Sequence, residues 1–266
     1  MKIFKFIKKG EREKSAENES THSVSDQPAK EESNNKLMEE QNKEQEVKPS
    51  KENVKVYNLI ILDQSGSMMS IYDPALSGVN ETLQTIRMAK AEHPDQEHFV
   101  TLVAFDRLPQ EGLRYNIIYD AIPAEDVVDI TSSQYRPYGN TPLFDAMGRA
   151  INELRDKINE DDVVLVTIIT DGYENASTEY SGVAIKSLVE EMRKKGWVFT
   201  YIGANQDVEK MAESMSINNF MEFQPTEWGT KQMFAKERLA RGKFFQKVSK
   251  RKDIGDKDFE SNYFDS

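Results

Sequence analysis

The stretch Val56–Ser67, which reads VYNLIILDQSGS, decides the fold that we predict for this chain. Its first seven residues are apolar except for Asn58, which is typical of a strand buried on both faces of a parallel sheet. The apolar run stops at Asp63, and Ser65 and Ser67 follow at alternate positions. Open α/β sheets bind ligands at the carboxyl ends of their strands, so these three side chains form a candidate site. A plain turn rich in Ser and Gly is the alternative interpretation.

Composition restricts the chemistry that such a site can use. The 266 residues include no cysteine, which excludes disulfides and cysteine-bound zinc and favours a reducing compartment. The three histidines, His22, His93 and His98, provide little material for a histidine-based catalytic site. Carboxylate and hydroxyl oxygens remain, and these suit Mg²⁺ or Mn²⁺ better than a soft metal. We therefore expect a hard divalent cation and a cytoplasmic location.

Charge is distributed unevenly along the chain. The formal net charge is −11, and residues 1–55 hold 12 basic and 12 acidic residues, so the whole excess of acid lies in residues 56–266. An acidic domain repels phosphate backbones, which argues against nucleic acid as the main partner. No apolar run approaches the roughly 18 residues that are needed to span a bilayer.

The first 55 residues differ in composition from the rest. Residues 10–55 contain no Phe, Tyr or Trp and cannot bury enough apolar surface to offset the entropy of ordering, so we predict a disordered linker. Met1–Lys9 is basic and apolar but too short and interrupted for a secretory signal peptide. A weak membrane or partner anchor is the alternative to an untethered tail. We predict a disordered charged tail at 1–55, a folded domain at 56–225, and a C-terminal helix with a polar tail at 226–266.

Strands and amphipathic helices alternate after the opening strand. Further strands are predicted at residues 99–105, 113–119, 163–170, 197–202 and 220–223. Helices are predicted after the N-cap Asp73, after Pro142, around Ile185–Met192, at residues 208–215 and at residues 228–248. Only about seven residues separate the second and third strands, too few for a helical crossover, so this pair is expected to be antiparallel. The predicted fold is α/β, a doubly wound, mostly parallel sheet with one antiparallel edge strand.

Two later stretches add oxygen ligands at the same edge of the predicted sheet. The stretch GNTPLFD (139–145) contains Thr141 just before a helix, and IITDG (168–172) ends a buried strand at Asp171. Asp63 and Asp171 both end buried strands, and helices start from the edge where strands end, so the three motifs are expected to meet. The alternatives are that Thr141 merely caps its helix and that Asp171 belongs to an ordinary turn.

This ordered set of motifs resembles the von Willebrand factor type A (VWA) domain, with its metal-ion-dependent adhesion site, over Tyr57–Phe223. The family pattern of Asp-x-Ser-x-Ser, a later Thr and a later Asp before Gly matches at Asp63, Ser65, Ser67, Thr141 and Asp171. The resemblance implies a Rossmann-like VWA fold in which the hydroxyl groups contact Mg²⁺ or Mn²⁺ and the aspartates contact it directly or through water. A partner's acidic side chain would complete the coordination. The stretches GNTPLFDAM, TDGYENAS and IGANQD are similar to those of bacterial or phage intracellular members, which implies an ATPase or an operon neighbour as partner.

We therefore predict a protein–protein interaction module that captures an acidic side chain through a divalent metal, and not an enzyme. The alternative is a metal-assisted hydrolase or phosphatase that uses the same acidic edge. The sequence contains no Gly-x-Ser-x-Gly elbow, Walker loop, dinucleotide fingerprint or His-Glu-x-x-His motif, and no base is evident beside Ser65 or Ser67. Glu174 is expected near the same edge, either to tune the site or as a solvated loop residue.

Overall fold

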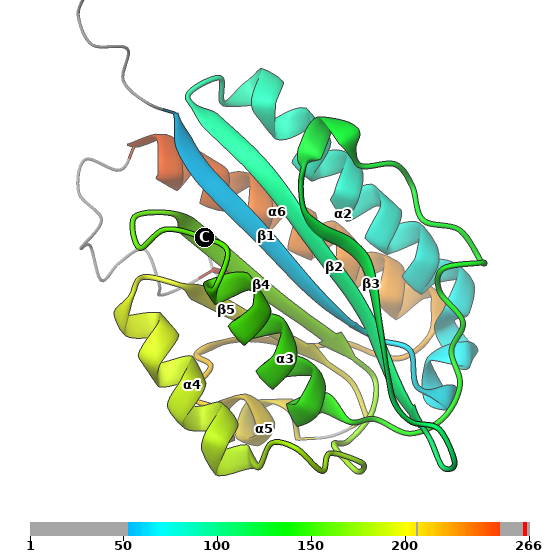
Figure 1. Cartoon of the computed structure of the whole chain (residues 1–266). Coiled ribbons are helices and arrows are strands. Elements are labelled where there is room, and N and C mark those ends of the chain that lie inside the picture. Colours follow the sequence, from blue (N-terminus) through cyan, green and yellow to red (C-terminus); the bar gives the residue numbers. More distant parts are fainter. Residues whose placement is uncertain (1–52, 206, 251–262, 265–266) are drawn as a thin grey trace, which may run out of the picture. The chain divides into compact units, whose positions relative to one another are not determined.

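Six strands form one sheet with the order β3-β2-β1-β4-β5-β6 (Figure 1). The computed structural model describes residues 53–205, 207–250 and 263–264. The strands are β1 (Val54–Asp63), β2 (Gln96–Leu108), β3 (Gly112–Pro123), β4 (Val163–Thr170), β5 (Val198–Gly203) and β6 (Asn219–Glu222). Neighbouring strands are parallel except β2 and β3, which pair antiparallel. The predicted α/β sheet with one antiparallel edge strand is confirmed.

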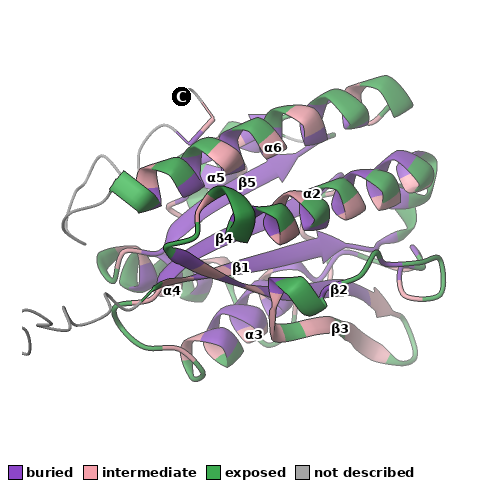
Figure 2. Ribbon diagram, turned by 90° about the horizontal axis from the view of Figure 1, so that it is seen from above, coloured by how far each residue is buried: buried purple, intermediate pink, exposed green. Residues whose placement is uncertain are grey.

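Helices cover both faces of the sheet (Figure 2). The helices are α2 (Tyr72–Glu92), α3 (Leu143–Arg155), α4 (Gly182–Lys194), α5 (Val208–Ser214) and α6 (Glu227–Lys250), with short 3-10 helices η1 (Gly66–Ile71) and η2 (Ala124–Asp126). Helices α2 and α6 share one buried apolar cluster with the sheet, whereas α3, α4 and α5 contribute to the other. The sheet separates the two clusters, as expected for a doubly wound fold.

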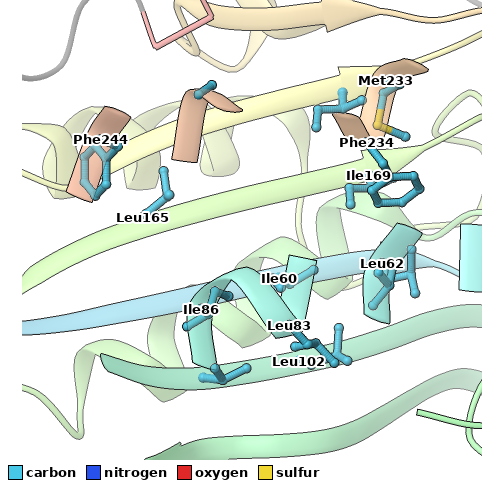
Figure 3. Close-up of a cluster of buried hydrophobic side chains, with 14 of the residues drawn as sticks. Ile60, Leu62, Leu83, Ile86, Leu102, Leu165, Ile169, Met233, Phe234 and Phe244 are labelled. Atoms are coloured by element: carbon cyan, nitrogen blue, oxygen red, sulfur yellow. The ribbon is translucent and has the colours of Figure 1, made fainter. Parts of the chain in front are cut away.

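Strand β1 lies in the middle of the sheet and contributes to both apolar clusters. Leu59 and Ile61 belong to the cluster with α3, α4 and α5, whereas Ile60 and Leu62 belong to the cluster with α2 and α6 (Figure 3). Successive side chains of a strand point to opposite faces, so a strand with helices on both faces is apolar throughout. The run therefore ends only where the strand leaves the core, at Asp63.

The chain enters its first long helix differently from the prediction. Asp73 was expected to be the N-cap, but η1 begins inside the Asp-x-Ser-x-Ser motif, at Gly66, and α2 begins at Tyr72, after Ile71. Asp73 lies in the first turn of α2 instead, where its negative charge still complements the helix dipole. The 3-10 turn keeps the motif close to the end of β1, because the chain curls at once and does not extend away.

The C-terminal helix α6 is part of the folded core, because Met233, Phe234, Phe244 and Phe245 belong to the cluster shared with α2. None of the described helices is both long enough and apolar enough to cross a membrane. The weak anchor predicted at Met1–Lys9 and residues 1–52 of the predicted disordered tail lie outside the described residues. The predicted end of the tail at residue 55 is too late, because β1 begins at Val54. The predicted division into three parts stays a prediction.

Candidate metal centre

Two neighbouring strands bring the acidic residues of the predicted site to one edge of the sheet. Strands β1 and β4 pair in parallel with Leu62 opposite Ile169, and Asp63 and Asp171 lie just beyond these residues at the carboxyl ends. Both aspartates are buried, with exposed fractions of 0% and 1%. The two acidic motifs therefore meet at the same edge.

Hydroxyl groups hold the two carboxylates. Thr170 Oγ1 donates to Asp63 Oδ2, and Ser67 Oγ donates to Asp171 Oδ1, each over 2.6 Å. The N–H of Ser65 donates to Asp63 Oδ1, also over 2.6 Å, so each oxygen of this carboxylate accepts a hydrogen bond. Ser65 Oγ lies 3.1 Å from Ser67 Oγ. Because Ser67 donates its only hydroxyl proton to Asp171, Ser65 is the donor of that pair.

The third motif meets the first two beside Gly172. A Cβ atom added to Gly172 would lie 3.2 Å from Thr141 Oγ1, 3.5 Å from Ser67 Oγ and 3.9 Å from Asp63 Oδ2. Oxygen atoms from separate loops thus surround one position, which glycine leaves open because it has no side chain. The other two residues of the predicted site join this group through their hydrogen bonds to Ser67. All five are brought together.

Thr141 does not act as the cap of helix α3. The residue at the N-cap position of α3 is Pro142, which makes no side-chain hydrogen bond to the helix. The N–H of Phe144 donates to Glu174 Oε2 over 3.0 Å, and the N–H of Asp145 donates to Ser177 Oγ over 3.1 Å. Because residues from another loop accept the free backbone N–H groups of the first turn, the hydroxyl group of Thr141 is left for the site.

Two carboxylates organise the loop that follows β4. Asp145, which is fully buried, accepts three successive N–H groups from residues 178–180 over 2.7 to 2.8 Å. Glu174 accepts the N–H groups of Ala176 and Ser177 over 2.9 and 2.7 Å. The expectation of a solvated loop residue is therefore wrong, since this half-buried carboxylate is held by hydrogen bonds within the protein, whereas tuning of the site by Glu174 stays a prediction. Glu174 satisfies backbone donors that would otherwise be unpaired in an irregular loop.

The loop before α3 is fixed against the end of β1. The N–H of Gly66 donates to the carbonyl oxygen of Gly139 over 2.9 Å, and the hydroxyl group of Tyr135 donates to the backbone oxygen of Asp63 over 3.0 Å. Gly139 has a φ of +82°, and a Cβ there would lie 2.5 Å from the carbonyl oxygen of Arg107. Only glycine fits this position, which brings the loop of the third motif against the first motif.

Burial makes the two carboxylates of the site unusually weak acids. It raises the pKa of Asp63 to about 7, although the hydrogen bonds from Thr170 and Ser65 act in the opposite direction, and the charge of Asp171 adds to the rise. Burial also raises the pKa of Asp171, against the effect of the hydrogen bond from Ser67. No Lys or Arg of the described residues offsets either effect. Asp171 Oδ2 is buried and has no hydrogen-bond partner in the described part of the chain.

These features fit a hard divalent cation. Buried negative charge is costly without a positive partner, and a cation would supply one. The available donors are two carboxylates and three hydroxyl groups, and all of them are oxygens, as Mg²⁺ and Mn²⁺ prefer. Within the described ranges no group of three or more His, Cys, Asp or Glu is placed to hold a metal. An ion at this edge would therefore depend on the hydroxyl groups.

Several residues that shape the site were not predicted from the sequence. Thr170 donates a hydrogen bond to Asp63. Asn175 makes two hydrogen bonds with Thr141: its Oδ1 accepts the backbone N–H of Thr141 over 2.9 Å, and its backbone N–H donates to the carbonyl oxygen of Thr141 over 3.1 Å. Asn205 Nδ2 donates to the backbone oxygen of Asp171 over 3.0 Å. The available signal was the density of polar residues in TDGYENAS and IGANQD.

Comparisons with known proteins agree with this architecture. The chain is similar in structure to the PilB minor pilin from Streptococcus sanguinis, with a TM-score of 0.52 and 12% identity over 74% of this chain and 63% of that chain. A mutant of the same pilin gives a TM-score of 0.50 and 13% identity over 76% and 64%. A von Willebrand factor type A protein from Catenulispora acidiphila gives a TM-score of 0.45 and 15% identity over 69% of this chain and 42% of that chain.

The chain spans less than two thirds of the length of these pilin chains, and at such low identity the likeness shows the fold alone. Comparison with curated protein sequences gave no match. The model of the von Willebrand factor type A domain family matches residues 59–236, which include all three motifs and reach into α6. The chain therefore belongs to the von Willebrand factor type A domain family.

Proposed function

We propose that this chain is a divalent-metal-dependent protein–protein interaction module. VWA domains are typically protein-interaction modules. The proposal goes further for this chain: Asp63, Ser65, Ser67, Thr141 and Asp171 would hold Mg²⁺ or Mn²⁺, and a partner's carboxylate would be captured there. The observation that carries it is the convergence of oxygens from separate loops beside Gly172, next to a buried carboxylate oxygen without a partner.

The charges of the five residues suit this role. Two carboxylates balance a divalent ion, and three neutral hydroxyl groups add ligands without adding negative charge. When bound, the ion would supply a Lewis acid with an open coordination position, which attracts a carboxylate. The residues of the chain hold these ligands in place through the Thr170 and Asn175 hydrogen bonds.

Calorimetric titration of the full chain with Mg²⁺ and with Mn²⁺ tests the metal site. We expect about one site per chain, with no detectable binding in Asp63→Asn and at least tenfold weaker binding in Thr141→Val. Both replacements preserve side-chain shape, so circular dichroism should be unchanged. Thr85→Val is the control and should bind as the wild type does, because half-buried Thr85 of α2 bonds only the backbone of its own helix. Wild-type affinity in Asp63→Asn would contradict the assignment.

A metal-assisted hydrolase is the second candidate, and one observation favours it. The sequence showed no base beside the serines, but in the folded chain Ser67 Oγ lies 2.6 Å from the carboxylate of Asp171. An adjacent carboxylate can activate a hydroxyl group. Assays with p-nitrophenyl phosphate and p-nitrophenyl acetate decide between the two: metal-dependent turnover lost in Asp171→Asn would support the enzyme, and metal binding without turnover would support the interaction module.

The partner and the cellular location stay predictions. Capture experiments with the full chain in Mg²⁺ and in chelator test for the expected ATPase or operon neighbour. Fluorescence imaging of the tagged full chain tests the cytoplasmic location.

A further inference from the structure

Large apolar side chains are exposed in each of the three loops that supply the site. Met69, Tyr138 and Tyr173 are 57%, 66% and 55% exposed. Met69 lies two residues after Ser67, and Tyr173 directly follows Gly172. Each of these exposed side chains therefore lies within a few positions of a site residue along the chain.

One backbone contact and the positions along the chain place these three residues near the site. Tyr138 donates its N–H to the carbonyl oxygen of Gln64, over 2.8 Å, between Asp63 and Ser65 of the first motif. Met69 lies in η1, which starts inside the same motif. Tyr173 follows the position where the oxygens of the loops converge. We call Met69, Tyr138 and Tyr173 the apolar rim.

The other exposed large apolar side chains of the described residues lie further than these three from the site residues along the chain. They are Met88 in α2, Ile117 in β3, Val128 after η2, Val183 in α4, and Trp228 and Leu239 in α6. Single exposed apolar side chains are ordinary on a protein surface, whereas several around one functional edge mark an interaction site. Tyr and Met are also among the residues enriched in protein interfaces.

We propose that the apolar rim selects the partner: a protein segment in which an Asp or Glu is flanked within two residues by large apolar side chains. This inference rests on the proposed function, because the acidic side chain would be the one captured at the metal. The rim would then bury the flanking side chains as the carboxylate enters the site. Arg136, exposed in the same loop as Tyr138, adds a positive charge that also favours an acidic segment.

Physical chemistry explains why both contacts are needed. A lone carboxylate offers one charged contact, and its desolvation offsets much of the gain. Burial of apolar side chains around it adds favourable free energy and excludes water from the charged contact. Specificity for one acidic segment among many then comes from the rim, because every Asp or Glu side chain presents the same carboxylate.

A displayed peptide library with a fixed central Asp and three random residues on each side tests the proposal. It is selected against the immobilised full chain in Mg²⁺. We expect enrichment of Phe, Tyr, Trp, Leu or Met within two residues of the Asp. The strongest peptide should bind at least tenfold more weakly to the triple variant Met69→Ser, Tyr138→Ser, Tyr173→Ser, and the Mn²⁺ affinity of this variant should stay within twofold of the wild type.

The control variant Met88→Ser, Val183→Ser, Leu239→Ser removes as many exposed apolar side chains elsewhere and should bind the peptide as the wild type does. Selected peptides with polar flanks, or full peptide affinity in the rim variant, would overturn the apolar rim and leave the proposed function standing. Equal binding in chelator, or of the peptide with Asn in place of its Asp, would overturn capture at the metal and leave the rim contact standing. A library that yields no binder would overturn both.

Discussion

Gly172 keeps the centre of the candidate site open. Its φ lies outside the left-handed region, so backbone conformation does not require glycine there. Space is tight, because a Cβ would be 3.2 Å from Thr141 Oγ1, closer than ordinary van der Waals contact. Gly66, between the two serines, differs: a Cβ there would lie 3.5 Å from the carbonyl oxygen of Gly139, and no atom of Thr141, Asp63 or Asp171 would lie within 4 Å of it.

This contrast gives a matched pair of substitutions. Gly172→Ala should weaken Mn²⁺ binding at least tenfold, since the methyl group would occupy the position that the oxygens surround. Its free energy of unfolding should change by about 1 kcal/mol or less, because lower entropy of the unfolded chain offsets the tight contact. Gly66→Ala should keep its Mn²⁺ affinity within twofold of the wild type. Titration calorimetry and urea unfolding measure both, and equal affinities in the two variants would argue against a metal position beside Gly172.

A glycine of helix α2 lies against a buried ring of helix α6. A Cβ at Gly78 of α2 would lie only 2.0 Å from a ring carbon of Phe234, whose side chain is 1% exposed. A buried ring has no free space into which it can turn, so the close packing of these helices depends on the missing side chain. Gly242 of α6 has no such neighbour, since nothing lies within 4 Å of a Cβ placed there.

At the scale of these elements we expect two Gly→Ala substitutions to have opposite effects. Gly78→Ala should lower the free energy of unfolding by about 1–3 kcal/mol, because the added methyl group overpacks the contact with Phe234. Gly242→Ala should raise it by about 0.5–1 kcal/mol, because alanine favours the helix and meets nothing. Urea unfolding followed by circular dichroism provides the measurement. A stabilised Gly78→Ala variant would mean that the two helices are not in contact there.

For the molecule as a whole, Arg241 connects the C-terminal helix to the middle of the sheet. Its side chain is fully buried and pairs with Glu237, which is 1% exposed, over 2.6 Å. Its Nη1 donates to Asn58 Oδ1 in β1, and its Nη2 donates to Thr167 Oγ1 in β4, each over 2.8 Å. Glu237 Oε1 also accepts from the hydroxyl group of Tyr263 over 3.3 Å. One buried ion pair thus joins α6, two central strands and the residues near the C-terminus.

Replacement of one partner of this ion pair should lower the free energy of unfolding more than replacement of both partners by apolar residues. Arg241→Met should lower the free energy of unfolding by about 3–5 kcal/mol, because Glu237 would remain buried without its positive partner. The double variant Arg241→Met, Glu237→Leu should lose less, since no buried charge is left unpaired. Urea unfolding of both proteins, with wild type alongside, measures the difference. A double variant less stable than the single one would show that the hydrogen bonds of the network matter more than its charge balance.

Local patterns in the sequence predict the sheet, its helices and the five candidate ligands. Apolar runs such as Leu59–Leu62 mark strands that are covered on both faces, and the short connection after β2 forces the antiparallel pair. Asp63 and Asp171 could be predicted as site residues because a charged residue that ends a buried apolar strand lies at the edge of the sheet. These features depend on which residues are neighbours along the chain, and the sequence states this directly.

The pairing of polar groups depends on the folded structure and is not visible in the sequence. Asn58, the polar exception in the opening strand, is explained by Arg241, which lies 183 positions further along the chain. Glu174 was placed near the site by its neighbours in sequence, but the N–H groups of its own loop and of α3 take up its carboxylate. The bond from Ser67 to Asp171 joins residues 104 positions apart. Such pairs form because buried donors and acceptors must be satisfied by whatever the fold places beside them, and no local pattern records that partner.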